Sequence, residues 1–380
     1  MKELEIYIHI PFCVRKCAYC DFLSGPSDEA DRELYVKLLC DEIEACKGKT
    51  EEYQVSTVFF GGGTPSVLSG KQIERIMQSL RENLQFRWDA EITLEANPGT
   101  VSEEKLHSYK KAGINRLSIG LQSVHDEELK LLGRIHTYSE FLTTYHMARK
   151  CGFQNINIDL ISAIPGQTVE SWCETLQTVL ALAPEHISAY SLIIEPRTPF
   201  YDMYGEDSGE NTGQIKLPSE DDERIMYWKT KEILAEAGYA RYEISNYAKP
   251  GFECRHNIGY WQRTPYLGFG TGAATLFEEK RYTNPPDIET YRISFDNKFH
   301  GEMLSREEQM EEFMFLGLRM MRGISKTAFH EMFGKEIENV YGEQICKLKD
   351  IKLLEEKADR IYLTEKGIDV SNAVFVEFMF

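Results

Sequence analysis

The chain has 380 residues, of which 42% are hydrophobic and 27% charged, the proportions of an ordinary globular protein. Its net charge of −18 argues against nucleic acid as a main partner, because phosphate contacts need clustered Lys and Arg. There is no run of about 18 apolar residues, so we expect neither a membrane span nor a signal peptide. The chain has nine cysteines, an odd number with no spacing pattern typical of paired disulfides, which favours a reducing, cytoplasmic compartment.

Strands and helices alternate over the first half of the chain. Strands are expected at 4–10, 55–60, 91–96, 116–121, 156–161 and 186–194, and helices at 29–46, 71–84 and 102–112. Such alternation is typical of βαβ units and a parallel sheet. Six units favour an α/β fold built on a partial (β/α)6 barrel of the TIM type. A doubly wound open sheet is the competing architecture.

Three cysteines follow the first expected strand in the motif C-V-R-K-C-A-Y-C, at Cys13, Cys17 and Cys20. Thiolates at these spacings on one loop can reach three corners of a cubane iron–sulfur cluster. A mononuclear zinc site usually has four closed protein ligands, and ferredoxin motifs supply four cysteines. The set therefore predicts a cluster with one iron open to a small molecule; three unrelated thiols are the alternative.

Other unusual residues also stand where expected strands end. The glycine run 61–63 follows the second strand, Glu95 and Gln122 end the next two, and Asp159 lies within the fifth. Ligands of parallel barrels and sheets sit at the carboxyl ends of strands, so these positions predict one shared site. His9, just before the cysteine loop, either hydrogen-bonds a thiolate sulfur or is a satisfied core histidine.

The alternation stops at residues 196–216, a stretch rich in Gly, Asp and Pro. We therefore expect a barrel domain over 1–217 and a smaller α+β C-terminal domain over 218–380. The second domain has a predicted helix at 221–237, a strand at 242–247 and mostly helix after Arg306. Its end, L-L-E-E-K-A-D-R-I-Y-L-T-E-K-G, predicts helix, turn and strand in a winged-helix-like module. The acidity of the chain favours packing or partner docking over DNA binding there.

The segments Y-I-H-I-P-F-C-V-R-K-C-A-Y-C-D-F and F-F-G-G-G-T-P-S resemble the radical S-adenosylmethionine (SAM) enzymes of the oxygen-independent coproporphyrinogen oxidase group. The resemblance implies that Cys13, Cys17 and Cys20 hold a [4Fe–4S] cluster whose fourth iron is chelated by SAM. One-electron reduction of the sulfonium can then release a 5′-deoxyadenosyl radical, which is chemistry that the cofactor supplies.

The same resemblance implies a set of SAM-binding residues. Glycines let the backbone approach the ligand, and Glu95 suits a cationic amino or sulfonium group. Gln122 and Arg134 suit the carboxylate, the arginine in bidentate fashion, and Asp159 matches the position that contacts the ribose hydroxyls. A structural hydrogen bond is the alternative role of each. The implied set is Tyr7, Tyr19, Gly62, Gly63, Thr64, Glu95, Gln122, Arg134 and Asp159.

Two features separate subgroups within this family. Phe22 stands two positions after the last cluster cysteine, where porphyrinogen dehydrogenases have a further cysteine. The sequence also starts six residues before Tyr7, without the N-terminal extension of those enzymes. Both departures argue against coproporphyrinogen III dehydrogenase, the oxidative decarboxylase of haem biosynthesis, which is the alternative function.

The segment from Cys254 to Trp261 contains H-N-x-x-Y-W, which resembles the signature of HemW-type haem chaperones. The resemblance implies that His256 ligates haem, with Cys254 as the other axial candidate, and that Asn257, Tyr260 and Trp261 complete the site. An aromatic core turn with a hydrogen-bonded His256 is the structural alternative.

The chaperone resemblance also implies partners: haem, haem-acceptor proteins including a membrane-associated one, and a second copy of the chain in a homodimer. Radical chemistry on haem itself is a third, weaker hypothesis for the function.

Overall fold

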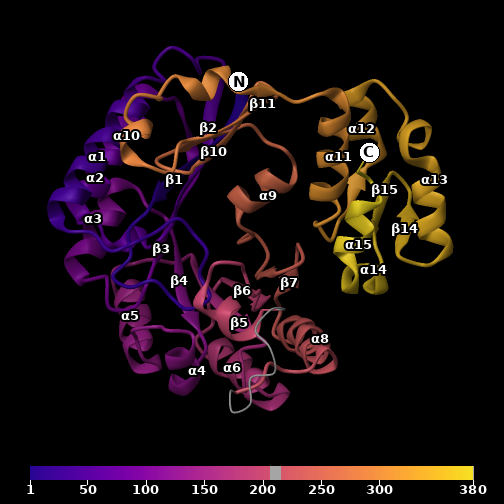
Figure 1. Cartoon of the computed structure of the whole chain (residues 1–380), viewed down its shortest axis with the longest axis horizontal. Helices are drawn as coiled ribbons and strands as arrows, with labels where there is room; N and C mark the ends of the chain where they lie inside the picture. Colours follow the sequence, from indigo (N-terminus) through magenta and orange to yellow (C-terminus); the bar gives the residue numbers. More distant parts are fainter. Residues whose placement is uncertain (206–214, 380) are drawn as a thin grey trace.

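Six parallel strands form the centre of the molecule (Figure 1). The computed structural model describes residues 1–205 and 215–379. The six strands are β1 (Lys2–Ile10), β2 (Tyr53–Gly62), β3 (Phe86–Ala96), β4 (Arg116–Gln122), β5 (Ile156–Ser162) and β6 (His186–Ser191). They lie side by side in chain order, which a doubly wound sheet does not do. The predicted partial (β/α)6 barrel is therefore confirmed.

Helices connect these strands and cover the outer face of the sheet (Figure 1). Several begin with reciprocal capping boxes, such as Ser69 with Gln72 and Thr137 with Glu140, which satisfy the free N–H groups of the first turn. The helical connections are α1 (Glu29–Glu44), η1 (Pro65–Val67), α2 (Gly70–Asn83), α3 (Glu103–Ala112), α4 (Asp126–Leu131), α5 (Tyr138–Lys150) and α6 (Val169–Leu180). The predicted helices 29–46, 71–84 and 102–112 are confirmed, with small differences at their ends.

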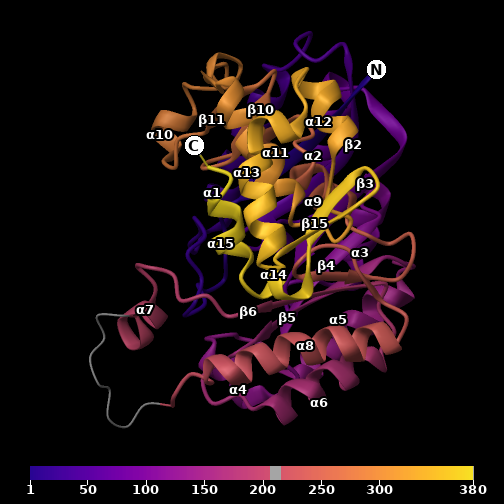
Figure 2. The same cartoon turned by 90° about the vertical axis from the view of Figure 1, so that its right-hand side faces the viewer.

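Later segments add strands to both edges of the same sheet. Beyond β1 lie β9 (Tyr266–Phe269), β10 (Ala274–Phe277), β11 (Lys280–Thr283) and β12 (Glu302–Met303), and beyond β6 lie β8 (Asn246–Ala248) and β7 (Ala240–Arg241). The sheet therefore continues across the predicted boundary between residues 217 and 218. Further helices here are α8 (Glu220–Glu236), which runs alongside α6 (Figure 2), and α9 (Arg255–Trp261), α10 (Ile288–Tyr291) and η2 (Asn297–His300).

The predicted strand at 242–247 is wrong, because the chain reverses there. Glu243 is buried, and its carboxylate accepts hydrogen bonds from the backbone N–H of Ser245 (2.8 Å) and the side-chain amide of Asn246 (2.7 Å). These bonds close a tight turn that sends β8 back antiparallel to β7. Within the predicted loop at 196–216, the structure has a short helix, α7 (Pro199–Tyr204); residues 206–214 lie outside the described residues.

The last part of the chain packs around a hydrophobic core of its own, over residues 310–378. Its elements are α11 (Arg306–Gly317), β13 (Ile324–Ser325), α12 (Lys326–Phe333), α13 (Ile337–Asp350), β14 (Leu354–Lys357), β15 (Arg360–Leu363), α14 (Glu365–Asp369) and α15 (Ser371–Val376). The order helix, strand, two helices and hairpin agrees with the predicted winged-helix-like end. The segment L-L-E-E-K is a strand rather than the predicted helix, since Leu354 pairs with Leu363 across the hairpin.

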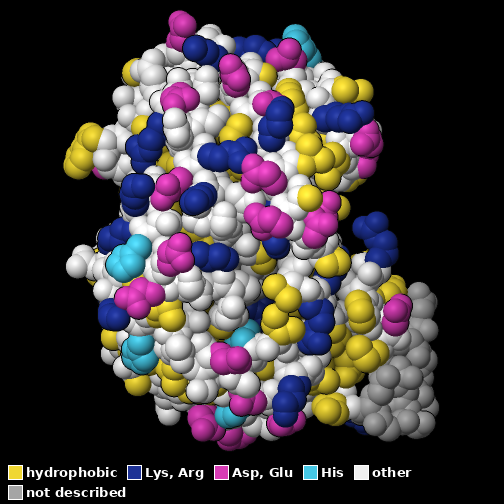
Figure 3. All heavy atoms as spheres, turned by 90° about the vertical axis from the view of Figure 1, so that its left-hand side faces the viewer, with side chains coloured by type: hydrophobic (Ala, Val, Ile, Leu, Met, Phe, Trp, Pro, Cys, Tyr) yellow, Lys and Arg dark blue, Asp and Glu magenta, His cyan; other side chains and the backbone are white. Residues whose placement is uncertain are grey.

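The outer helices carry charges of both signs. Figure 3 shows Lys and Arg side chains interspersed with Asp and Glu over the described part of this face, without the segregated basic patch that nucleic acid binding needs. Ion pairs join neighbouring helices, as between Arg75 and Glu33 and between Lys150 and Glu103. Among the described residues, no helix combines the length and the apolar character that crossing a bilayer requires.

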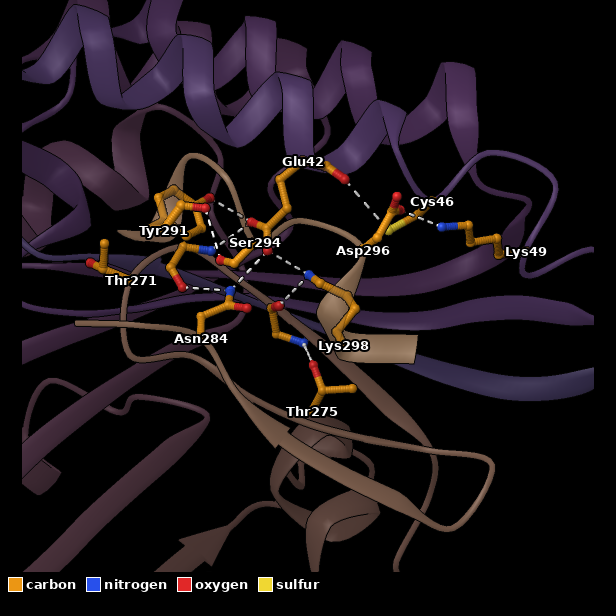
Figure 4. A network of polar contacts seen from close by, with 12 residues as sticks. Glu42, Cys46, Lys49, Thr271, Thr275, Asn284, Tyr291, Ser294, Asp296 and Lys298 are labelled. Atoms are coloured by element: carbon orange, nitrogen blue, oxygen red, sulfur yellow. Dashed lines mark hydrogen bonds and ion pairs between the residues drawn. The ribbon is translucent and has the colours of Figure 1, made fainter. Parts of the chain in front are cut away.

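A buried ion pair ties the later strands to the first helix (Figure 4). Glu42 of α1 lies 2.6 Å from Nζ of Lys298 of η2, and both side chains are fully buried. The carboxylate also accepts hydrogen bonds from the N–H of Gly270 (2.9 Å), the amide of Asn284 (2.8 Å) and the hydroxyl of Tyr291 (2.5 Å). The turn between β9 and β10 is thereby fastened to α1.

We predict that Lys298→Met lowers the free energy of unfolding by about 3–5 kcal/mol, because it leaves the Glu42 carboxylate buried without its cation. Urea unfolding measures the change. The double variant Glu42→Gln/Lys298→Met should recover much of the loss. Lys37→Met, which breaks an exposed ion pair with Asp41 on the same helix, is the control. Equal effects of Lys298→Met and Lys37→Met would show that the buried pair is not critical.

Candidate cofactor-binding site

A cavity of about 470 Å³ opens where the central parallel strands end. Its walls contain the three motif cysteines and every residue that the sequence predicted for SAM. The sequence-predicted residues that line it are Tyr7, Cys13, Cys17, Tyr19, Cys20, Gly62, Gly63, Thr64, Glu95, Gln122, Arg134, Asp159 and Asn257. Residues from distant parts of the chain therefore meet at one site, as expected from the ends of parallel strands.

The cysteine loop is anchored by backbone contacts on both sides. The N–H of Cys13 donates to the carbonyl of Gly25 (2.8 Å), and the N–H of Ala18 donates to the carbonyl of Leu132 (3.0 Å). A Cβ at Gly63 would lie 2.7 Å from the carbonyl oxygen of Phe12 and 3.0 Å from Sγ of Cys13. Only glycine lets β2 approach the loop this closely, so the glycine run shapes the cysteine loop as well as the cavity.

Gly62 makes room for His9, which has a structural role. Gly62 has a φ of +107°, and a Cβ there would lie 2.5 Å from the His9 ring. Nε2–H of His9 donates to the carbonyl of Leu23 (2.9 Å), which fixes the tautomer, so Nδ1 accepts from the hydroxyl of Tyr7 (3.1 Å). His9 therefore holds the far end of the cysteine loop and orients Tyr7, and its hydrogen bonds go to these groups rather than to a thiolate.

A chain of polar contacts joins two of the thiols. The guanidinium of Arg134 lies 3.7 Å from Sγ of Cys17 and donates to Oδ1 of Asn97 (2.7 Å). Asn97 donates to Oγ1 of Thr64 (2.8 Å), which lies 3.7 Å from Sγ of Cys13. This contact places positive charge next to a sulfur atom that a metal would bind. Nε of Arg134 is buried without a hydrogen-bond partner among the described residues, so this side chain has a donor left for a ligand.

The cavity contains acceptors suited to an amino group. Gln122 has a φ of +78° at a register shift between β4 and β5, and its Oε1 is buried without a partner in the described part of the chain. Burial, and then the nearby charge of Asp159, raise the pKa of Glu95 to about 8. A bound ammonium group would donate to the free Oε1 of Gln122, a residue that the sequence assigned to the carboxylate of SAM, and would place positive charge beside Glu95. The residues present therefore fit the amino-acid end of SAM.

Asp159 belongs to a hydrogen-bonded row on the cavity floor. Its carboxylate accepts from the hydroxyl of Ser118 (2.9 Å) and the amide of Asn157 (2.7 Å), and burial raises its pKa. Asn157 is held in turn by Nδ1–H of His186 (2.6 Å). With Ser188 as a third side-chain donor, the protein still fills fewer sites than the about four that an ionised carboxylate offers, so Asp159 keeps acceptor capacity for a hydroxyl ligand.

Sequence reasoning missed several residues that line the cavity. Alternation along strands would have found some of them, since Asn157 shares a face of β5 with Asp159, and Ser118 shares a face of β4 with Gln122. Others come from the ends of β4 and β6, from a loop or from the added strand β8. The missed residues include Asn97, Arg116, Ser118, Asn157, Ser188, Tyr190 and Asn246.

The three cysteines fit an iron–sulfur cluster. All are free and partly accessible, and all line the same cavity from one loop. Three thiols would hold three irons of a cubane cluster and would leave the fourth iron without a protein ligand. The donor set thus matches a cluster with one open iron better than a closed zinc site.

The four residues predicted for haem do not share a cavity. His256 is 1% exposed, its Nδ1 lies 2.7 Å from Oγ1 of Thr57, and its ring stacks on Phe59. Asn257 lines the cofactor cavity, Tyr260 packs on His256, and Trp261 lines a second cavity. Nε2 of His256 is buried without a partner among the described residues, so one ring nitrogen stays available.

The other axial candidate, Cys254, is fully buried. Its Sγ lies 3.7 Å from a carboxylate oxygen of Glu91, and burial raises the pKa of the thiol to about 12. A protonated, enclosed thiol is a poor haem ligand, which favours His256 of the two candidates.

Comparison with known proteins defines the class. The Radical SAM superfamily profile matches residues 7–179, and the HemN C-terminal domain profile matches residues 304–370. The structure of Escherichia coli coproporphyrinogen III oxidase (HemN), described as a radical SAM enzyme, superimposes with a TM-score of 0.83 at 24% identity, covering 99% of this chain and 90% of that one. Fold and site together define a radical SAM protein with a HemN-like C-terminal domain.

Relatives narrow the class to one family. Heme chaperone HemW of Lactococcus lactis is 38% identical, over all of this chain and 98% of its own length. Heme chaperone HemW of Bacillus subtilis is 37% identical over 98% of both chains, and that of Escherichia coli is 34% identical over 100% of this chain and 99% of its own. The chain belongs to the HemW family.

The burial of His256 predicts a pH-dependent stability. Burial, and then the charge of Arg116, lower the pKa of His256 from 6.5 to about 3, so unfolding takes up a proton as the pH falls below about 6.5. His256 therefore contributes stability above pH 6.5 that is lost between pH 6.5 and 3, by at most about 1.4 kcal/mol per pH unit. His256→Gln removes this part of the acid sensitivity.

Urea unfolding of the wild type and of His256→Gln at several pH values between 7 and 4 measures the effect. The gap in unfolding free energy between the two proteins should narrow toward low pH. His146→Gln, at an exposed position, should follow the wild type at every pH. A gap between wild type and His256→Gln that is independent of pH contradicts the prediction.

Proposed function

We propose that this protein is a haem chaperone that binds haem and delivers it to acceptor proteins. The observation that carries the proposal is the similarity to proteins named heme chaperone HemW, at 34–38% identity over the full length of both chains. The similarity spans the cysteine loop, the cavity and the C-terminal domain together.

The proposal includes a [4Fe–4S] cluster on Cys13, Cys17 and Cys20 and SAM beside it. When bound, the cluster supplies single electrons and an open iron. The chain's own residues hold and orient these groups: Arg134 places positive charge beside the thiolates, and Glu95 and Gln122 suit the amino group of SAM. Asp159 keeps acceptor capacity for the ribose hydroxyls.

The partners and the compartment belong to the same proposal. All nine cysteines are free, which suits a reducing cytoplasm. Family resemblance supports a homodimer and a membrane-associated acceptor among the haem-receiving proteins. The net charge of −18 and the mixed charges of the outer helices argue against nucleic acid.

One residue argues against the porphyrinogen dehydrogenase alternative. Phe22 is 62% exposed and lines the cofactor cavity, where dehydrogenases of the resembling group have a further cysteine. An aromatic ring offers apolar surface at the cavity mouth, but it supplies no thiol for ligation or proton transfer.

We predict that Cys17→Ala loses most of its iron, sulfide and brown absorption after anaerobic reconstitution, because one of the three thiolate ligands is gone. Iron and sulfide analysis measures the loss. Cys346→Ala, which changes an exposed thiol on α13, should reconstitute like the wild type. A Cys17→Ala protein that keeps a full [4Fe–4S] cluster would refute the ligand assignment.

We predict that the reconstituted protein, given SAM and a reductant, binds haem stably and leaves coproporphyrinogen III unconverted. Chromatography of the porphyrins and the absorption spectrum of the haem complex measure both outcomes. His256→Ala tests the ligand that the family resemblance implies, with His146→Ala, at an exposed position, as the control. Appreciable formation of protoporphyrinogen would overturn the chaperone proposal, and an unchanged haem complex in His256→Ala would overturn the assigned ligand.

A further inference from the structure

A second cavity, of about 310 Å³, lies between the end of α9 and the C-terminal domain. Figure 1 shows α9 between the barrel and α11, and these two helices are in contact. The volume lies within the range of small-molecule pockets, about 300–1,000 Å³. The lining shares no residue with the cofactor cavity. It consists of Trp261, Gln262, Arg263, Phe313, Gly317, Met320, Arg322, Gly323, Ile324, Ser325, Ala328, Met332 and Arg360.

The walls of this cavity are largely apolar and aromatic. Trp261 and Phe313 supply flat surfaces, and Met320 and Met332 supply deformable thioether chains. The guanidinium of Arg319 lies 4.4 Å from the Trp261 ring centroid, a cation–π contact that steadies the indole. The indole N–H is buried without a hydrogen-bond partner among the described residues. The walls therefore suit a flat apolar ligand with an acceptor group.

Two arginines of the cavity lack a carboxylate partner. Arg360 donates to the backbone carbonyls of Arg322 (3.4 Å) and Gly323 (3.3 Å), and neither arginine forms an ion pair with any described residue. Partial burial, and then the charge of Arg360, lower the pKa of Arg322. The neighbouring Asp359 is engaged by the hydroxyls of Ser325 (2.5 Å) and Thr327 (2.7 Å).

The third arginine of the cavity, Arg263, differs from these two because it has carboxylate partners. Arg263 is buried, and it pairs with Glu279 (2.7 Å) and Glu312 (2.9 Å), so its charge is already compensated inside the protein. Among the described lining residues, Arg322 and Arg360 are the cations that form no ion pair; both are exposed, and Arg360 acts on Asp359 only through longer-range attraction. Two neighbouring guanidinium groups that lack carboxylate partners are suited to bind the carboxylates of a ligand in bidentate fashion.

We propose that the cavity between α9 and the C-terminal domain binds haem, with the propionates on Arg322 and Arg360 and the macrocycle against the apolar wall that includes Trp261. This inference rests on the proposed chaperone function and adds the place where the cargo carboxylates are recognised. It accounts for Trp261 lying outside the cofactor cavity, and it places the macrocycle away from His256, which lines neither cavity. Haem is the flat, apolar, dianionic molecule that the cavity chemistry selects.

Titration of the reconstituted protein with haem and with haem dimethyl ester tests the proposal, since the ester lacks the two negative charges. The wild type should bind haem at least 10-fold more tightly than the ester. Arg322→Gln/Arg360→Gln should raise the Kd for haem at least 10-fold and leave the Kd for the ester unchanged. Arg322→Lys/Arg360→Lys should restore part of the affinity, because it keeps the charge but not the fork of donors.

A matched control is Arg75→Gln/Arg292→Gln, which removes the same charge from exposed ion pairs elsewhere and should bind haem like the wild type. Unchanged iron and sulfide content shows that each variant is folded. Equal affinity of the wild type for haem and ester, or an unchanged Kd in the Gln pair, overturns this site and leaves the chaperone function standing. A wild type that binds no haem at all overturns the proposed function itself.

Discussion

The buried ion pair between Glu42 and Lys298 is the interaction on which the cofactor site depends. The Glu42 carboxylate also binds the N–H of Gly270, in the turn after β9, and β9 pairs with β1. In the same turn, Thr271 donates its N–H to the hydroxyl of Tyr35 (3.0 Å), which itself donates to the carbonyl of His9 (2.9 Å). His9 then holds the far end of the cysteine loop through Leu23 and orients Tyr7. Breaking a buried pair is costly because the remaining charge stays desolvated, so one ion pair fixes the frame around the cysteine loop.

Two cavities flank the short helix α9. The first combines three thiols, the carboxyl groups of Glu95 and Asp159 and several basic side chains, and suits a zwitterionic amino-acid group beside an iron–sulfur cluster. The second has apolar walls and the arginines Arg322 and Arg360, which form no ion pair with a described residue. Asn257 borders the first and Trp261 the second, so α9 touches both.

The helical spacing of H-N-x-x-Y-W explains why its residues diverge. Residues four apart lie on the same stripe of a helix, so His256 and Tyr260 form one stripe, and Asn257 and Trp261 form the next. The first stripe packs on β2 through Thr57 and Phe59 and is buried. The second stripe reaches the two cavities one helical turn apart. A motif that is continuous in sequence thus serves the core and both cavities at once.

Local patterns in the sequence determined much of the fold and of the cofactor site of this protein. Hydrophobic runs located the six parallel strands, and the spacing of Cys13, Cys17 and Cys20 determined a three-thiol loop, because both depend on neighbours in the chain. The positions of Glu95, Gln122 and Asp159 followed from the rule that parallel strands end at one edge. Only the tertiary structure decided that Arg134 and Asn97 connect the thiols, and that Arg322 meets Arg360 through the pairing of β13 with β15. These contacts join residues far apart in sequence, and no local pattern encodes which distant side chains the packed sheet brings together.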